Sequence, residues 1–120
     1  FIIGPLYGTS FSVEENGKSL SLGAELEKEG VHAAISTGHP EMNLEILSTQ
    51  LILMTDRGLS RKEAIRGVTA YPAEYMGISS QVGTLEPGKD ADLVIWDGDP
   101  LEYDGGVKRL FIDGEEIALS

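Results

Sequence analysis

The sequence contains no cysteine and only two histidines, His32 and His39. Without cysteine the chain can form neither a disulfide nor a thiolate metal site, although this absence leaves the redox compartment open. Two imidazoles are also too few for a histidine-rich metal centre. Both kinds of metal centre are therefore excluded for this chain by itself.

Positive charge and long apolar runs are scarce as well. Nine basic residues stand against twenty acidic ones, which gives a formal net charge of -11, and the acidic residues are scattered along the chain. Nucleic acids and anionic membrane surfaces attract positive charge, so we expect neither as a partner. No stretch approaches the roughly 20 apolar residues of a membrane span. The basic start of a signal peptide is missing too, and we expect a cytoplasmic protein.

The remaining composition is that of a globular protein. With 120 residues and 41% hydrophobic content, the chain has the size of one domain or of part of one. Its first residues, Phe1-Ile2-Ile3, are apolar and β-prone, and no initiating methionine precedes them. They look like a strand entered midway, so we expect a fragment or a processed product.

The spacing of apolar residues predicts a strand, a helix and a second strand in the first third of the chain. A strand at residues 1–3 is followed by a loop that extends to about Gly17, and residues 19–29 fit an amphipathic helix with Gly30 as its C′ residue. Residues 31–36 form the second strand. This order favours a parallel pair with a right-handed crossover.

Helices are predicted next. Asn43 can cap an apolar, mostly buried helix that ends at Arg57-Gly58, and residues 60–63 form a capping box that starts another helix. Tyr71-Pro72 breaks that helix, with Pro72 as the first residue of a short helical turn that closes at Gly77.

Beyond Gly77 the pattern becomes that of β-strands. Residues 92–96 and 107–112 read as strands, and Asp113-Gly114 is a two-residue hairpin signal. We therefore divide the chain into an α/β part at residues 1–79 and a β part at residues 80–120.

The candidate site lies where the strand at residues 31–36 ends. Gly38-His39-Pro40 follows this strand, and ligands of α/β proteins collect at the carboxyl ends of such strands. His39 could contact a substrate or supply part of a base function, since imidazole titrates near neutrality. Equally, it could cap the next helix or lie exposed. His32 is predicted to be a packing or surface residue.

Several acidic and aromatic residues resemble site residues, but a structural role is favoured for each. Glu41 and Glu45 share the start of a helix, where negative charge is favourable. Asp90 and Asp92 precede a strand and are expected to stabilise a turn. The aromatic residues Tyr71, Tyr75 and Trp96 are expected to pack in the core or at an interface.

Taken together, these motifs resemble the carboxyl-terminal part of the metal-dependent amidohydrolases, in particular the imidazolonepropionase-like branch. The resemblance rests on the following residues: Gly58-Leu59-Ser60 with Glu63-Ala64, Thr69-Ala70-Tyr71-Pro72-Ala73, Gly77, and Val82-Gly83-Thr84-Leu85-Glu86-Pro87-Gly88-Lys89-Asp90-Ala91-Asp92-Leu93-Val94.

The resemblance implies a fold and a metal that this chain does not complete. Members of the family combine a (β/α)8 barrel with a small β-sandwich, so this α/β chain would supply the last two βα units of the barrel and the carboxyl-terminal strands of the sandwich. A complete member is expected to hold a divalent metal such as zinc. The metal-binding histidines lie on strands outside this chain, so we expect no metal ligand within it.

One residue departs from the family. The eighth barrel strand of these enzymes ends in an aspartate that binds metal and accepts a proton from the attacking water, in a sequence such as Thr-Asp-His-Pro. This chain has Thr37-Gly38-His39-Pro40. Glycine has no side chain, so Gly38 marks the position of the catalytic residue but cannot act, and loss of a general base typically costs about 10²- to 10⁴-fold in rate.

Two functions are predicted from this resemblance. The first is the carboxyl-terminal part of a hydrolase that acts on carbon–nitrogen bonds of small cyclic amides or amines and that is inactive when isolated. The second is a non-catalytic binding or assembly domain derived from the same fold. In both cases open strand edges and an apolar helix face must be covered, either by the amino-terminal remainder of the enzyme or by self-association.

Overall fold

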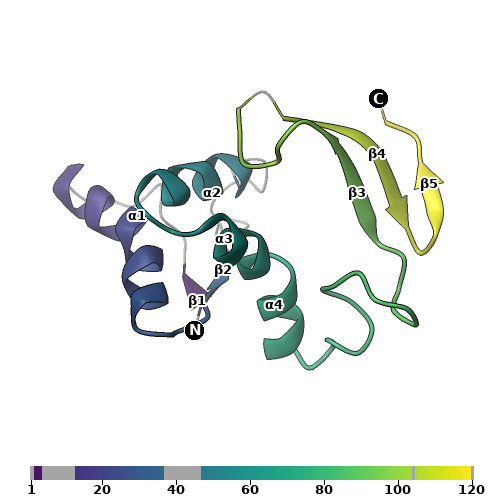
Figure 1. Cartoon of the computed structure of the whole chain (residues 1–120), viewed down its shortest axis with the longest axis horizontal. Helices are drawn as coiled ribbons and strands as arrows, with labels where there is room; N and C mark the ends of the chain where they lie inside the picture. Colours follow the sequence, from purple (N-terminus) through teal and green to yellow (C-terminus); the bar gives the residue numbers. More distant parts are fainter. Residues whose placement is uncertain (1, 4–12, 37–46, 104, 120) are drawn as a thin grey trace.

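The structure is a computed structural model, and it describes residues 2–3, 13–36, 47–103 and 105–119; for residues 3 and 13–20 it describes the backbone alone. Figure 1 shows two parts: helices and two short strands on one side, and a three-stranded sheet that stands apart from them. Among the described residues, no helix has both the length and the hydropathy that a bilayer-spanning segment needs.

The first part begins with the predicted parallel strand pair. Strand β1 (Ile2–Ile3) pairs in parallel with β2 (Ala34–Ile35), and helix α1 (Val13–Lys28) connects them. The parallel pairing confirms the prediction from the strand–helix–strand order. Because the strands are parallel, their carboxyl ends lie at the same edge.

Helix α1 begins earlier than the sequence suggested. The predicted loop up to Gly17 is wrong in its second half, since the helix starts at Val13 and continues through Asn16-Gly17. A glycine inside a helix costs only about 1 kcal/mol, which neighbouring helical residues can offset. The predicted end is confirmed: Gly30 has a φ of 76°, and the Val31 N–H donates to the Leu26 carbonyl at 2.9 Å, as in a Schellman motif.

Three helices follow: α2 (Leu47–Asp56), α3 (Arg61–Gly67) and α4 (Ala70–Tyr75). The predicted break is confirmed but misplaced, because α3 stops at Gly67 and Pro72 is the third residue of α4 rather than its first. Pro72 has no N–H for the carbonyl of Val68, and its ring would clash with that carbonyl in a continuous helix. The chain therefore leaves the helical path before the proline, at Val68 and Thr69.

The core lies between these helices and β2. Met54 is completely buried at the centre of a cluster that also includes one residue of the β part, Leu101, which is 3% exposed. The cluster consists of Ile35, Leu51, Met54, Leu59, Ala64 and Leu101. Leu101 thus joins the two parts of the molecule.

The β part is an antiparallel sheet in the order β3–β4–β5, formed by β3 (Leu93–Asp97), β4 (Gly106–Ile112) and β5 (Glu115–Ile117). Asp113 and Gly114 link β4 to β5 with φ values of 52° and 78°, the two positive values of a type I′ turn. The predicted hairpin is therefore confirmed. Apolar side chains of this sheet remain exposed, among them Val94, Ile95, Val107, Ile112 and Ile117.

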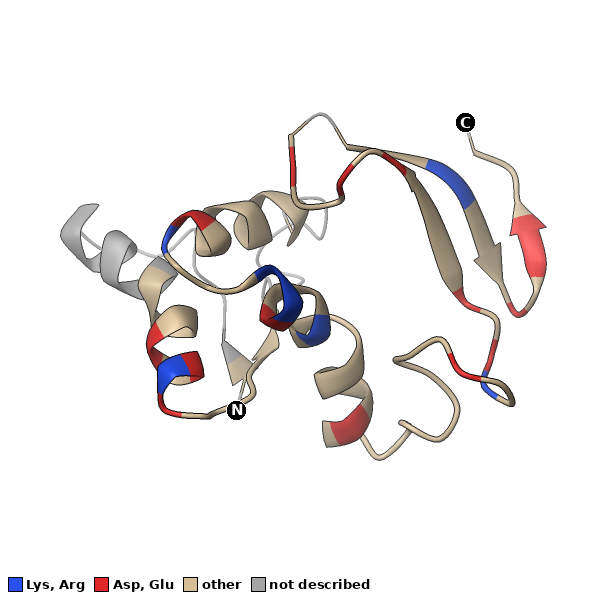
Figure 2. Ribbon diagram, viewed as in Figure 1, with Lys and Arg blue, Asp and Glu red and all other residues tan. Residues whose placement is uncertain are grey.

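Charged side chains also connect the two parts. Three basic residues gather on α3, whereas acidic residues are spread over the molecule (Figure 2). Arg61 of α3 forms ion pairs with Asp99, which follows β3, and with Glu102 at 3.6 Å. These side chains are about half exposed, so the pairs contribute little to stability and mainly orient the loop that carries Leu101.

At Gly67, α3 lies close against Ile35 of β2 and the preceding Ala33. A Cβ atom at this position would lie 2.6 Å from Ile35 Cδ1 and 3.0 Å from the Ala33 carbonyl oxygen. We expect Gly67→Ala to lower the free energy of unfolding by about 1–3 kcal/mol, as overpacking does, in a urea titration. Gly106→Ala is the matched control, because no atom lies within 4 Å of its added Cβ. Equal losses for both variants would contradict the close packing.

Candidate functional site

The predicted site at the carboxyl end of β2 is described up to Ser36. Gly38, His39, Glu41 and Glu45 lie outside the described residues, so their predicted roles stay predictions. Ile3 and Ile35 pair in the parallel ladder, so the carboxyl ends of both strands lie at the same edge.

Gln50 is the residue at this edge that the sequence reasoning missed. Its side chain is completely buried, and its Nε2 donates a hydrogen bond to the Ser36 carbonyl oxygen at 3.1 Å. The signal for it was present, since Gln50 lies in the apolar stripe of α2 with Leu47, Leu51 and Met54. A glutamine on a buried helix face must find a polar partner, and here that partner is the end of the strand.

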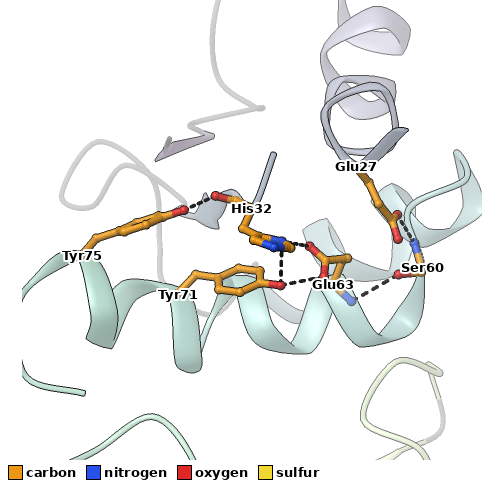
Figure 3. A network of polar contacts seen from close by, with 6 residues as sticks. All are labelled: Glu27, His32, Ser60, Glu63, Tyr71 and Tyr75. Atoms are coloured by element: carbon orange, nitrogen blue, oxygen red, sulfur yellow. Dashed lines mark hydrogen bonds and ion pairs between the residues drawn. The ribbon is translucent and has the colours of Figure 1, made fainter. Parts of the chain in front are cut away.

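A second polar network lies at the opposite, amino-terminal end of β2. His32 stacks on Tyr71, with ring centroids 4.8 Å apart, and both side chains meet the Glu63 carboxylate (Figure 3). The Tyr71 hydroxyl donates to Glu63 Oε1 at 2.6 Å, so the imidazole Nδ1–H donates to the Tyr71 oxygen at 2.9 Å and to Glu63 Oε2 at 3.3 Å. The Tyr75 hydroxyl donates to the His32 backbone carbonyl. The network ties α3 and α4 to the start of β2.

The capping box explains why Glu63 is available for this network. Ser60 Oγ accepts from the Glu63 N–H at 3.2 Å, which confirms half of the predicted box. The other half is taken over by α1, because the Ser60 N–H donates to Glu27 Oε2 at 2.9 Å (Figure 3). The Glu63 side chain is thereby released toward Tyr71 and His32.

The network shifts the pKa values of two of its members. Burial alone would raise the pKa of Glu63, but the hydrogen bonds from Tyr71 and His32 outweigh burial and lower the pKa below the ordinary 4.5. Burial and the hydrogen bond to Glu63 raise the pKa of Tyr71 above the ordinary 10.0. The folded state therefore favours a charged carboxylate beside a neutral phenol.

These shifts predict how stability depends on pH. The contribution of Glu63 is present above about pH 4.5 and is lost as pH falls through its lower folded pKa. The contribution of Tyr71 is present below about pH 10 and is lost as pH rises through its higher folded pKa. We expect Glu63→Gln to reduce the loss of the free energy of unfolding at acidic pH, as measured by urea denaturation. Tyr71→Phe should lower this free energy by about 1–3 kcal/mol at pH 7. Glu74→Gln, at an exposed carboxylate of α4, is the control and should leave the pH dependence as it is in the unsubstituted chain.

The location of this network also favours a structural role. His32 precedes Ser36 by four residues, up to about 13 Å of extended chain, so it lies away from the carboxyl end where ligands collect. The His32 side chain is 59% exposed and stacks on Tyr71, which agrees with the predicted packing or surface role. Tyr71 is 6% exposed, which confirms its predicted position in the core, whereas Tyr75 is 46% exposed and is not a core residue.

The acidic pair that precedes β3 has a structural role at Asp92. Asp92 Oδ1 accepts from the Asp113 N–H at 2.8 Å, and the Ala91 carbonyl accepts from Gly114 at 3.1 Å, so this stretch holds the β4–β5 turn. Within the described ranges, no three histidine or carboxylate side chains gather as a metal site would require.

The sequence of this chain is similar to those of known proteins. The sequence pattern of the amidohydrolase family matches residues 11–117. The chain belongs to the amidohydrolase family. The amidohydrolase segment is 40% identical over 81 residues to an imidazolonepropionase of Sphingopyxis alaskensis, covering 64% of this chain and 20% of that protein. It is 30% identical over 94 residues to amidohydrolase tasK of Hapsidospora irregularis, covering 78% of this chain and 10% of that protein.

Solved structures extend the likeness to the fold of the segment. An amidohydrolase from Thermotoga maritima superimposes with a TM-score of 0.84 at 34% identity, over 98% of this chain and 30% of that one. A Xaa-Pro dipeptidase superimposes with a TM-score of 0.72 at 23% identity, which shows a shared fold alone. The segment thus spans a fifth or less of these two sequence relatives and less than a third of the Thermotoga protein.

Proposed function

We propose that this amidohydrolase segment is the carboxyl-terminal part of a metal-dependent hydrolase that acts on carbon–nitrogen bonds of small cyclic amides or amines. The observation that carries the proposal is the match of nearly the whole chain to 30% of the Thermotoga maritima amidohydrolase. The imidazolonepropionase relatives support a cyclic amide as the substrate class. Within a longer protein, β1 and β2 would continue a (β/α)8 barrel, and β3–β5 would continue a β-sandwich.

The described residues of this chain do not gather into a metal site. Gly38 offers no side-chain ligand atom at the position of the family aspartate, and the described residues hold no group of three potential ligands. The metal ligands would therefore come from the amino-terminal remainder. The segment's own contribution is to hold β2, which precedes position 38 in the sequence, through the contacts at both ends of this strand.

The exposed apolar residues of the sheet support a partner for this segment. Val107, Ile112 and Ile117 are 39–52% exposed on strands that lie apart from the core (Figure 1). In the longer protein the amino-terminal remainder would cover them, and in the isolated chain self-association would do so. A cytoplasmic location remains part of the proposal.

Gly38 favours a second candidate function, a binding or assembly domain that has lost catalysis. Turnover separates the two, because both can bind a ligand. The longer protein is loaded with zinc and incubated with five- and six-membered cyclic amides, with Xaa-Pro dipeptides as the matched comparison, and products are measured over time. The hydrolase proposal predicts slow formation of ring-opened product from a cyclic amide. Cleavage of the dipeptides alone would change the substrate class, and calorimetric binding without any product would favour the non-catalytic domain.

A further inference from the structure

A groove lies between α3 and the loop that follows β3. It has a volume of about 650 Å³ and opens to solvent. This volume lies within the range of small-molecule sites in proteins. One side of the groove is the exposed face of α3, and the other is residues 98–101. Ile65 and Leu101 give it apolar surface from both sides.

The two sides of the groove are held together by contacts that are present without a ligand. Arg61 of α3 forms ion pairs with Asp99 and Glu102, and Asp99 Oδ1 accepts from the Leu101 N–H at 2.8 Å. Leu101 itself is anchored in the core, where it is 3% exposed. A ligand would therefore find the groove already formed, which lowers the cost of ordering it on binding.

The groove gathers positive charge in an acidic chain. Three of the nine basic residues lie along it on α3, namely Arg61, Lys62 and Arg66 (Figure 2). Arg61 is paired as described, and Arg66 lies close to the Glu63 carboxylate. Lys62 forms no ion pair within the part of the chain that the structure describes. One ammonium group is therefore available to an anion in the groove.

We propose that this groove binds an organic monocarboxylate, whose carboxylate pairs with Lys62 and whose apolar body lies against Ile65 and Leu101. A second negative charge on the ligand would meet Asp99 and Glu102, so a monoanion fits better than a dianion such as phosphate. The site uses neither position 38 nor hydrolysis. It therefore goes beyond the proposed function and does not depend on it.

A methyl NMR titration tests the proposal in the longer protein, with isotope-labelled methyl groups of isoleucine and leucine. The probes are 3-phenylpropionate, its neutral amide 3-phenylpropanamide, and acetate, which lacks the apolar body. We expect saturable shifts of the Ile65 and Leu101 methyl signals with 3-phenylpropionate. The amide should bind about three- to fivefold more weakly, the effect of one solvent-exposed ion pair. Acetate should bind more than about tenfold more weakly, because it buries little apolar surface.

Two lysine substitutions decide whether the preference for the carboxylate comes from this groove. Lys62→Gln removes the charge at an exposed position and should bring the affinities for the acid and its amide within about twofold of each other. Lys28→Gln makes the same chemical change at an exposed lysine of α1 and should leave the preference as it is. Ile65→Ser should weaken both ligands by the same factor, since each loses the same apolar contact.

Three results would overturn the proposal. The first is an absence of shifts at Ile65 and Leu101 at saturating concentrations of 3-phenylpropionate, or shifts at Ile95 of the sheet in their place. The second is equal affinity of the unsubstituted protein for the acid and the amide. The third is a preference for the acid that survives Lys62→Gln. Because no readout uses turnover, failure of the hydrolase proposal would leave this test intact.

Discussion

Gly38→Asp in the zinc-loaded longer protein should raise kcat/KM for a cyclic amide by about 10²- to 10⁴-fold. The substitution restores a carboxylate at the position where the family places its general base, after Thr37 and before His39-Pro40. A correctly placed base contributes about this factor to proton transfer, and a carboxylate also supplies a ligand for a divalent cation. The measurement is steady-state hydrolysis of the cyclic amide that binds most tightly.

The matched control for this prediction is Gly38→Asn. Asparagine has nearly the same size and shape as aspartate but carries no negative charge and cannot accept the proton from water. It should give less than a tenth of the gain. Equal rates for both variants, or no gain with zinc still bound, would contradict the assignment of position 38 and favour the non-catalytic domain.

Leu101→Ala should lower the free energy of unfolding by about 2–5 kcal/mol. Leu101 is 3% exposed and packs in the cluster around Met54, although it belongs to the loop between β3 and β4. Its N–H donates to Asp99 Oδ1 at 2.8 Å, which holds the loop in the conformation that inserts the side chain. The truncation removes apolar contacts and leaves a cavity where the two parts of the molecule meet.

Leu85→Ala is the comparison for this loss, because it is the same substitution at a side chain that is 77% exposed. Its effect should stay within about 0.5 kcal/mol. Urea denaturation followed by circular dichroism measures both variants. Similar small losses at the two positions would show that the sheet does not depend on Leu101 for its attachment.

The parts of the fold that could be predicted depend on local chemistry. Gly30 ends α1 because a positive φ suits glycine, Ser60 caps α3 through the Glu63 N–H, and Asp113-Gly114 forms the turn that its sequence favours. The order of strand, helix and strand, which follows from the spacing of apolar residues, was also enough to predict the parallel pairing of β1 and β2. Each of these features is decided by a few neighbouring residues.

The features that could not be predicted depend on contacts between distant residues. Helix α1 passes through Gly17 despite its low helix propensity, and the break before Pro72 falls at Val68 and Thr69 because the proline acts on the carbonyl four residues earlier. The contact between Glu27 and Ser60, 33 residues apart, has no local signal.

For the candidate site, the sequence indicated the location but not the side-chain contacts that hold the strand there. The carboxyl end of the second strand was predicted from the order of elements, whereas the contact from Gln50 to Ser36 depends on how α2 returns to β2. His32 was predicted to be a packing or surface residue, but its partners, Tyr71 and Glu63, lie 39 and 31 residues away and could not be predicted. A buried glutamine in an apolar stripe was the one available signal.

The most direct test of the account is native mass spectrometry with metal analysis on the same samples, comparing the isolated 120-residue chain with the longer protein. The account predicts a metal-free, self-associated isolated chain and a longer protein that carries about one or two divalent metal ions. An isolated chain that binds zinc stoichiometrically, or a longer protein that binds none when zinc is supplied, would contradict the claim that this segment completes a metal-dependent hydrolase whose ligands lie elsewhere.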